Sequence, residues 1–222
     1  PEINIITVED PVEFRMRGIN QVQVNNKAGM TFAAALRSIL RADPDVVLIG
    51  EIRDQETANI AIEASLTGHL VLSTLHTNDA PSAVTRLTEM GVEPFLLSSS
   101  LAAVMAQRLA RRLCKKCKRQ DTATEAELRT LGVPHMPDTP LPTIWRPVGC
   151  RECANTGYSG RVAIQQVMGV DSTMEDLIAR GATSIDIDKA AKEQGMTTLR
   201  KDGWQKALQG ITSVEEVLRV TV

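Results

Sequence analysis

Two short cysteine motifs carry the strongest chemical signal in the sequence. Two residues separate Cys114 from Cys117, and two residues separate Cys150 from Cys153. Four thiolates supplied by two such knuckles match a structural zinc site, in which the metal sits in a closed tetrahedron. The alternative is two unrelated pairs of buried or oxidised thiols, which the identical spacing and the polar or basic flanking residues disfavour. We therefore expect one bound Zn²⁺ and a reducing compartment.

Acidic residues also follow two short apolar segments that have the composition of β-strands. Glu9 and Asp10 come after the run 3–8, and Glu51 comes after the run 46–49. The second run is unbroken, as expected for a central strand of a parallel sheet that is covered on both faces. Ligands bind at the carboxyl ends of such strands, where a carboxylate can orient Mg²⁺ or polarise an attacking water.

Each of these carboxylates also has a purely structural interpretation. Glu51 can be the surface ion-pair partner of Arg53, and Asp10 precedes Pro11 and can be a turn residue. Taken alone, a glutamate at a strand end favours the structural interpretation. The chemical interpretation needs further polar residues at the same edge of the sheet.

A histidine meets that requirement at the end of a third expected strand, residues 69–74. His76 follows this strand among Thr and Asn residues and is the better candidate for contacting a ligand. His69 lies within the strand and is expected to be a hydrogen-bonded core residue.

Helices are expected between these strands. Apolar residues at helical spacing, interrupted by Pro or Gly, predict helices over residues 31–41, 55–66, 80–90 and 94–113. Alternation of strands and helices is typical of a parallel α/β sheet. We therefore expect an α/β fold whose sheet places the three polar strand ends at one edge.

The second half of the chain has a different character. A polar, proline-rich segment separates the two cysteine pairs, and helices are expected beyond it over residues 174–179, 185–194, 199–208 and 214–220. We predict an α/β core, a zinc-binding insert and a C-terminal helical subdomain, over residues 1–113, 114–160 and 161–222.

Composition and charge limit the class of protein. The chain has 222 residues, 43% of them hydrophobic and 23% charged, and a net charge of −2, all ordinary for a soluble globular protein. No window approaches the roughly 18 apolar residues of a membrane span, so none is expected. Because no export signal follows Pro1, we expect a piece of a longer cytoplasmic protein.

Positive charge is concentrated in residues 108–119, which hold seven basic and no acidic side chains. This basic run can be a solvated face or an interface with an acidic neighbour. Binding to nucleic-acid phosphates is the alternative. The run contains no aromatic residue and offers no stacking platform, so we expect no direct nucleic-acid partner, and contact with a duplex backbone stays open.

Taken together, these motifs resemble those of the secretion ATPases that power type II secretion and type IV pilus assembly, over essentially the whole chain. Residues 6–13 (ITVEDPVE) resemble the Asp box of that family, residues 43–54 (DPDVVLIGEIRD) its atypical Walker B motif, and residues 67–78 its His box. The cysteine pairs and residues 156–161 (TGYSGR) resemble its tetracysteine insert.

The resemblance implies a partial RecA-like P-loop ATPase core that uses ATP and Mg²⁺ in a homohexameric ring. It implies that Glu51 positions or deprotonates the attacking water, that Glu9 lies near Mg²⁺ and the γ-phosphate, and that His76 contacts the γ-phosphate. It also implies supporting or cofactor-binding roles within the same motifs for Asp10, Arg53 and His69.

The same resemblance implies a location in the cytoplasm, peripheral to the inner membrane, where the ring acts on an assembly platform protein. The tetracysteine insert favours assembly and secretion ATPases over the related pilus-retraction ATPases, which lack it. The choice between pilus and secretion system, and the protein that is transported, stay open.

One motif of the family is missing from these residues. The Walker A loop, Gly-x-x-x-x-Gly-Lys-Ser/Thr, has no match in the sequence. Its backbone N–H groups and its lysine form the cradle for the phosphates, so we expect the isolated chain to hydrolyse ATP negligibly. Two other classes stay open: a hexameric nucleic-acid translocase, and a zinc-ribbon binding module that would explain residues 108–160 only.

Overall fold

The computed structural model describes residues 2–136 and 138–221, which form two compact units. Unit 1 comprises Pro1–Val104 and Gly169–Ala190, and unit 2 comprises Met105–Met168 and Ala191–Val222. The division into 1–113, 114–160 and 161–222 stays a prediction, and positions 1, 137 and 222 lie outside the described residues.

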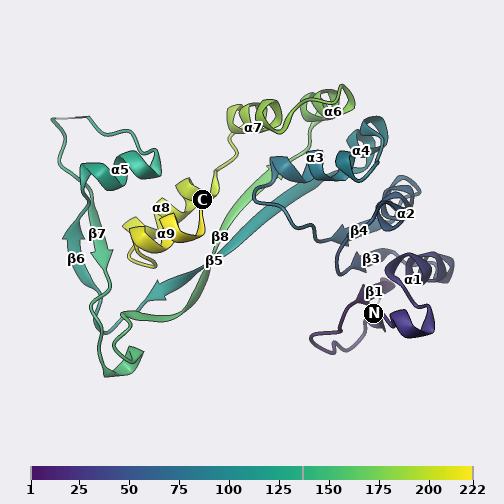
Figure 1. Ribbon diagram of the computed structural model, residues 1–222, viewed down its shortest axis with the longest axis horizontal. Coiled ribbons are helices and arrows are strands. Elements are labelled where there is room, and N and C mark those ends of the chain that lie inside the picture. The colour runs from purple at the N-terminus through teal and green to yellow at the C-terminus, as the bar shows by residue number, and fades with distance from the viewer. Residues whose placement is uncertain (1, 137, 222) are drawn as a thin grey trace. The chain divides into compact units, whose positions relative to one another are not determined.

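Unit 1 contains a four-stranded sheet in which every neighbouring pair is parallel. The strand order is β2 (Asn20–Gln23), β1 (Ile5–Glu9), β3 (Val46–Ile49) and β4 (Leu70–Ser73). Figure 1 labels β1, β3 and β4 of this sheet. The predicted parallel α/β sheet is therefore confirmed, and β2 is an additional strand that the sequence analysis did not anticipate.

Hydrophobic burial explains the centre of this sheet. Val8 on β1 and Val47 and Ile49 on β3 are completely buried, as expected for strands covered on both faces. At the sheet edge, Leu70 and Leu72 on β4 are 55% and 47% exposed.

Thr and Asp residues cap the N-termini of helices in unit 1 by accepting hydrogen bonds from backbone N–H groups of the first turn. Thr31 accepts from the N–H of Ala34, and Asp54 accepts from the N–H of Thr57, which stabilises the first turns of α1 and α2. The helices are α1 (Phe32–Ile39), α2 (Gln55–Leu66), α3 (Pro81–Glu89), α4 (Pro94–Ser100), α6 (Ser172–Ala179) and α7 (Ser184–Glu193), which extends past the unit boundary. Short 3₁₀ helices cover Asn26–Ala28 and Leu40–Ala42.

The predicted helix over residues 94–113 is wrong in its second part. α4 ends at Ser100, and the chain continues as the long strand β5 (Ala103–Leu113), which pairs with β8 (Tyr158–Gly169). β5 is rich in Ala, Leu, Arg, Met and Gln, which are good helix formers. Ala106, Ala110 and Leu113 of β5 are buried, so pairing and burial override the intrinsic helix preference.

Unit 2 combines this two-stranded sheet with a smaller one and the helices α5 (Glu125–Leu131), α8 (Leu199–Leu208) and α9 (Val214–Val220). β6 (Arg119–Thr122) pairs antiparallel with β7 (Thr143–Arg146), and α5 lies between them in the sequence. A 3₁₀ turn covers Arg151–Cys153. α8 packs on α9, and with α6 and α7 these helices confirm the predicted helical C-terminal region. Across the described residues, no helix combines the length and apolar composition that a membrane span requires.

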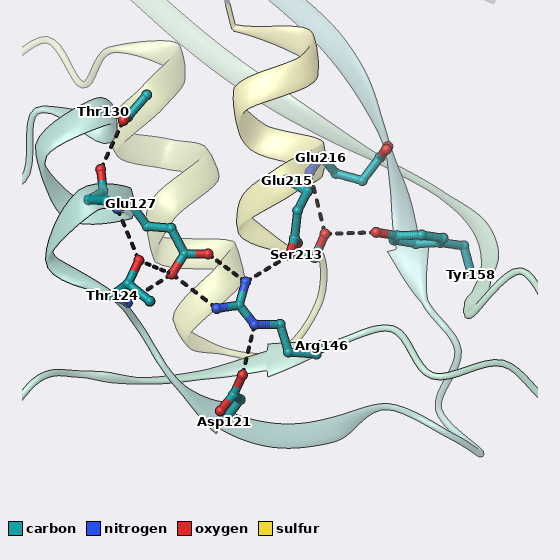
Figure 2. Close-up of polar contacts among 10 residues, drawn as sticks. Asp121, Thr124, Glu127, Thr130, Arg146, Tyr158, Ser213, Glu215 and Glu216 are labelled. Carbon is teal, nitrogen blue, oxygen red and sulfur yellow. Dashed lines mark hydrogen bonds and ion pairs between the residues drawn. The ribbon is translucent and has the colours of Figure 1, made fainter.

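Arg146 joins several elements of unit 2 (Figure 2). Its guanidinium donates to both carboxylate oxygens of Glu127 on α5, at 2.5 and 3.0 Å, and also to Asp121 on β6 and Glu215 on α9, at 2.9 and 2.7 Å. The hydrogen bonds from Arg146 lower the pKa of Glu127. Only 19% of the Arg146 side chain is exposed, so solvent screens these ion pairs less than ordinary surface pairs.

A second carboxylate, Glu216, is almost fully buried with 1% of its side chain exposed. It accepts from the backbone N–H and the guanidinium of Arg111 at 2.8 and 2.6 Å, and from Arg219 at 2.8 and 2.7 Å. Burial opposes ionisation, but the hydrogen bonds from Arg219 and Arg111 lower the pKa of Glu216 to about 2. Nearby, the hydroxyl of Tyr158 lies 2.8 Å from that of Ser213 (Figure 2).

We predict that Arg146→Ala lowers the free energy of unfolding by about 2 kcal/mol, because three carboxylates lose their common partner. The matched control is Arg129→Ala, which removes only an exposed pair with Glu125 at 3.7 Å and should cost less than about 0.5 kcal/mol. Urea denaturation of both variants measures the difference. Equal effects would show that the Arg146 cluster does not stabilise unit 2.

We predict that the buried carboxylate makes stability depend on pH. The pKa of Glu216 lies near 2 in the folded chain and near 4.5 without these contacts, so its contribution is complete above about pH 5 and is lost as the pH falls toward 2. Glu216→Gln should therefore be less stable than the parent chain by at most about 3 kcal/mol at neutral pH, with the difference shrinking toward pH 2. Denaturation series at several pH values test this, and a difference independent of pH contradicts it.

Candidate functional site

Three neighbouring parallel strands of unit 1 bring their carboxyl ends to one edge of the sheet. In the register, Val8 of β1 lies beside Ile49 of β3, and Ile49 lies beside Ser73 of β4. Glu9 ends β1, Glu51 follows β3 after one glycine, and His76 follows β4 after two residues. The predicted strand-end residues therefore share one edge.

Glu51 has close partners at this edge. Its two carboxylate oxygens accept from Nε and Nη2 of Arg53 at 2.5 and 2.6 Å, and Nε2 of His76 lies 3.3 Å from Oε2. The Glu51 side chain is 14% exposed, whereas those of Arg53 and His76 are 62% and 88% exposed. The hydrogen bonds from Arg53 lower the pKa of Glu51, so the carboxylate is charged at neutral pH.

Both interpretations of Glu51 therefore apply. Glu51 is an ion-pair partner of Arg53, and it also contacts His76, which follows the neighbouring strand β4. The exposed Arg53 side chain can rotate away from the carboxylate at little cost, because a surface ion pair contributes less than about 1 kcal/mol. A sheltered carboxylate with exposed, movable cationic partners can accept a proton or orient a water.

Close packing supports the backbone around Glu51. A Cβ on Gly50 would lie 3.3 Å from the carbonyl oxygen of Val8, and the N–H of Gly50 donates to this oxygen at 2.8 Å. Thr74 of the chain beyond β4 donates from its hydroxyl to the carbonyl of Gly50 at 2.6 Å. Both contacts hold the segment that carries Glu51 against its neighbours.

Glu9 is oriented by residues of its own sheet. Its Oε1 accepts from the hydroxyl of Thr7 at 2.6 Å and from the side-chain amide of Gln21 at 3.0 Å. Asp10 is exposed, and the bond between Asp10 and Pro11 is cis. The carboxylates of Glu9 and Glu51 are the oxygen ligands at this edge that would suit Mg²⁺.

His69 lies at the opposite end of its strand. It precedes Leu70, the first residue of β4, and its Nδ1 lies 3.0 Å from the carbonyl oxygen of Ala64 and 3.2 Å from the hydroxyl of Thr67 at the end of α2. The structure therefore brings Glu51 and His76 into contact and does not bring His69 to them.

A polar hollow of about 280 Å³ adjoins His76, and the sequence analysis did not anticipate it. The helix α3 contributes Ser82, Thr85, Arg86 and Glu89 to its lining. The Thr85 hydroxyl is buried without a hydrogen-bond partner. The spacing of these four residues places them on one face of a helix, and this polar face is the signal that could have predicted them.

The four cysteines of unit 2 form one cluster. Their Sγ atoms all lie within 4.8 Å of one another, and three of the separations are 3.9, 3.9 and 3.8 Å: Cys114 to Cys150, Cys117 to Cys153, and Cys150 to Cys153. A tetrahedron of sulfur atoms around zinc, with Zn–S distances of about 2.3 Å, has edges of about 3.8 Å. The described cysteines therefore fit a four-thiolate metal site.

Backbone N–H groups donate hydrogen bonds to the sulfur atoms of Cys117 and Cys153. Gly149 donates to Cys117 at 3.3 Å, and Cys150 and Gly157 donate to Cys153 at 3.2 Å each. Although burial opposes ionisation, the backbone hydrogen bonds from Cys150 and Gly157 lower the pKa of Cys153 to about 6, whereas burial raises the pKa of Cys150 to about 11. Gly149 and Gly157 have φ of 109° and 78°, and a Cβ on either would lie within 2.7 Å of neighbouring atoms, so the knuckle requires glycine at both positions.

Comparison with known proteins finds relatives along the whole chain. Residues 1–219 match the family described as Type II/IV secretion system protein. The chain is 56% identical over 218 residues to the Type II secretion system protein E of Pseudomonas aeruginosa, with 98% of this chain and 43% of that protein covered. It is 51% identical over 222 residues to the Type IV pilus assembly ATPase PilB of Thermus thermophilus, with 100% of this chain and 25% of that protein covered.

A solved structure has the same fold. The pilus retraction motor PilT, crystallised with bound ADP, matches with a TM-score of 0.70 and 25% identity, over 98% of this chain and 52% of that chain. The predicted resemblance and the α/β fold are confirmed by these matches. The chain spans less than half of the length of the two relatives by sequence.

Proposed function

The chain belongs to the Type II/IV secretion system protein family, and we propose that it is part of an ATPase that powers type II secretion or type IV pilus assembly. The contact between Glu51 and His76 at the ends of adjacent parallel strands carries this proposal. It is supported by relatives at 51% and 56% identity whose names are those of a pilus assembly ATPase and a type II secretion protein.

In the proposed reaction, Glu51 orients the attacking water and accepts its proton, and Glu9 helps to hold Mg²⁺. Arg53 keeps Glu51 ionised and must rotate away from at least one carboxylate oxygen before a water can occupy its place. His76 and Arg53 are the exposed donors that can contact phosphate oxygens. Asp10 adds a negative charge beside Arg53, and His69 supports the strand from its far end.

Further parts of the proposal concern the assembly. We infer that the parent protein works as a homohexamer in the cytoplasm, peripheral to the inner membrane, and acts on an assembly platform protein. The names of the relatives support a role in pilus assembly or secretion, and the cysteine cluster supports a bound Zn²⁺ that holds the segment between the two knuckles.

We predict that Glu51→Gln lowers kcat for ATP hydrolysis in the full-length parent protein by about 10²–10⁴-fold, because the amide cannot accept the proton of water. Glu56→Gln is the matched control, since it makes the same chemical change at an exposed residue whose partner is Arg37, and its kcat should change less than about twofold. A steady-state phosphate-release assay measures both, and a Glu51→Gln protein with the parent's kcat would contradict the assigned role.

The 222-residue chain alone should show negligible turnover in the same assay, because its sequence has no phosphate-binding glycine loop. Turnover that Glu51→Gln abolishes in this chain would overturn that expectation. ATPase activity that requires added polynucleotide would instead favour a nucleic-acid translocase.

We predict about one Zn²⁺ per chain in protein prepared under reducing conditions, as measured by elemental analysis. All four cysteines of the sequence belong to the cluster, so thiol titration before and after chelation reports on this site alone. When free zinc exceeds its Kd 100-fold, bound zinc should raise the free energy of unfolding by about 3 kcal/mol. Removal of zinc with a chelator, or the change Cys150→Ser, should abolish this stabilisation. Metal-free protein with unchanged stability would refute the zinc site.

A further inference from the structure

The basic run 108–119 is divided by the fold into two groups of side chains. Arg111 is bound to Glu216, and Lys118 donates to the carbonyl of Gly210 at 2.7 Å and lies over the ring of Trp145. These residues satisfy internal contacts. Others from the same run point toward a hollow beside the cysteine cluster.

This hollow, which we call the basic pocket, has a volume of about 390 Å³. Its charged lining consists of four basic side chains and one acidic side chain: Arg112, Lys115, Lys116, Arg161 and Glu152. Arg112 lies near the end of β5, the two lysines lie between the first pair of cysteines, and Arg161 comes from β8. Segments that are far apart in the sequence therefore contribute positively charged side chains to the basic pocket.

One carboxylate, Glu152, lines the pocket together with these four cations and forms no ion pair with any of them. None of them has a recorded ion pair or side-chain hydrogen bond among the described residues, and Lys115, Lys116 and Arg161 are exposed. Like charges gathered around a hollow repel one another, and the field between low-dielectric walls attracts an anion. Arg146 and Arg111 in the same unit are bound by carboxylates, in contrast to the four cations of the pocket.

The chemistry of the lining indicates the class of anion. Guanidinium forks match the oxygen geometry of phosphate, and lysines add point charges. Ser159 contributes a hydroxyl, and the space beside Gly160 is open, because a Cβ there would meet nothing within 4 Å. The volume lies in the lower part of the range of small-ligand pockets, whereas a duplex would need an extended surface.

We propose that the basic pocket binds a phosphate-bearing anion and thus forms an anion site made of residues other than those of the candidate ATP site. Its four cations belong to unit 2, and Glu9, Glu51 and His76 belong to unit 1. The phosphate can come from a soluble molecule or from a lipid headgroup, and both sources present the same charge and oxygen geometry.

The test uses the zinc-loaded 222-residue chain and titration calorimetry with pyrophosphate. The double variant Lys115→Gln/Lys116→Gln should weaken binding at least about tenfold, since charged hydrogen bonds are lost. The control Lys27→Gln/Lys201→Gln changes the net charge equally at exposed residues away from the pocket lining, and it should bind within about twofold of the parent. Arg161→Gln is a second test variant from a different strand and should also weaken binding. None of these variants alters the candidate ATP site, so a selective loss assigns the binding to the pocket.

A second arm distinguishes the two sources of phosphate. Sedimentation with vesicles of phosphatidylglycerol, compared with phosphatidylcholine, detects a lipid headgroup. Loss of pyrophosphate or vesicle binding in the pocket variants, but not in the control, supports the proposal. Absence of both kinds of binding, or an equal loss in the control, overturns it. Binding of duplex DNA alone would also overturn it in favour of a nucleic-acid surface.

Discussion

The parallel pairing of β1, β3 and β4 is the constraint on which the candidate site depends. Parallel strands point their carboxyl ends in one direction, so residues distant in the sequence must meet wherever those strands end. The register places Val8, Ile49 and Ser73 side by side, and Glu51 and His76 then come within contact distance. A shift of one residue in any strand would turn its side chains to the opposite face of the sheet, so the buried Val47 and Ile49 fix the position of Glu51 as well as stabilising the core.

Unit 2 combines a buried apolar core with ion-pair networks that join its short elements. Arg146 connects β6, β7, α5 and α9, and Glu216 connects α9 to β5 through Arg111. Such buried ion pairs offer little net stabilisation over apolar packing, but they tolerate no unpaired member. They therefore select one arrangement of the short elements that they join. The unpaired cations of the basic pocket differ from this internal pattern and are available to a ligand.

The sequence predicted those features that depend on local pattern. Apolar runs predicted β1, β3 and β4, helical spacing predicted the last four helices, and identical spacing predicted the cysteine cluster. The helix expected up to Leu113 was wrong, since β5 consists of helix-forming residues whose conformation is decided by pairing with β8. β8 was not predicted, because the buried Gln166 interrupts its apolar alternation. The partners of Arg146 and Glu216 were beyond prediction, since Arg111 and Glu216 lie 105 positions apart.

The position of the cysteine cluster has a consequence for chain entropy. Cys114 follows the last residue of β5, and Cys150 and Cys153 precede the first residue of β8, so the knuckles occupy the place that a tight turn would take in a hairpin. Joining Cys114 to Cys150 spans 36 positions, and each doubling of such a loop adds only about 0.6 kcal/mol to the entropic cost of closure. Closure of the ribbon therefore depends on the knuckles and hardly on the number of residues between them. The loops of that segment that lie outside β6, α5 and β7 are therefore free to lengthen, shorten or acquire new surface during evolution while the ribbon keeps its pairing.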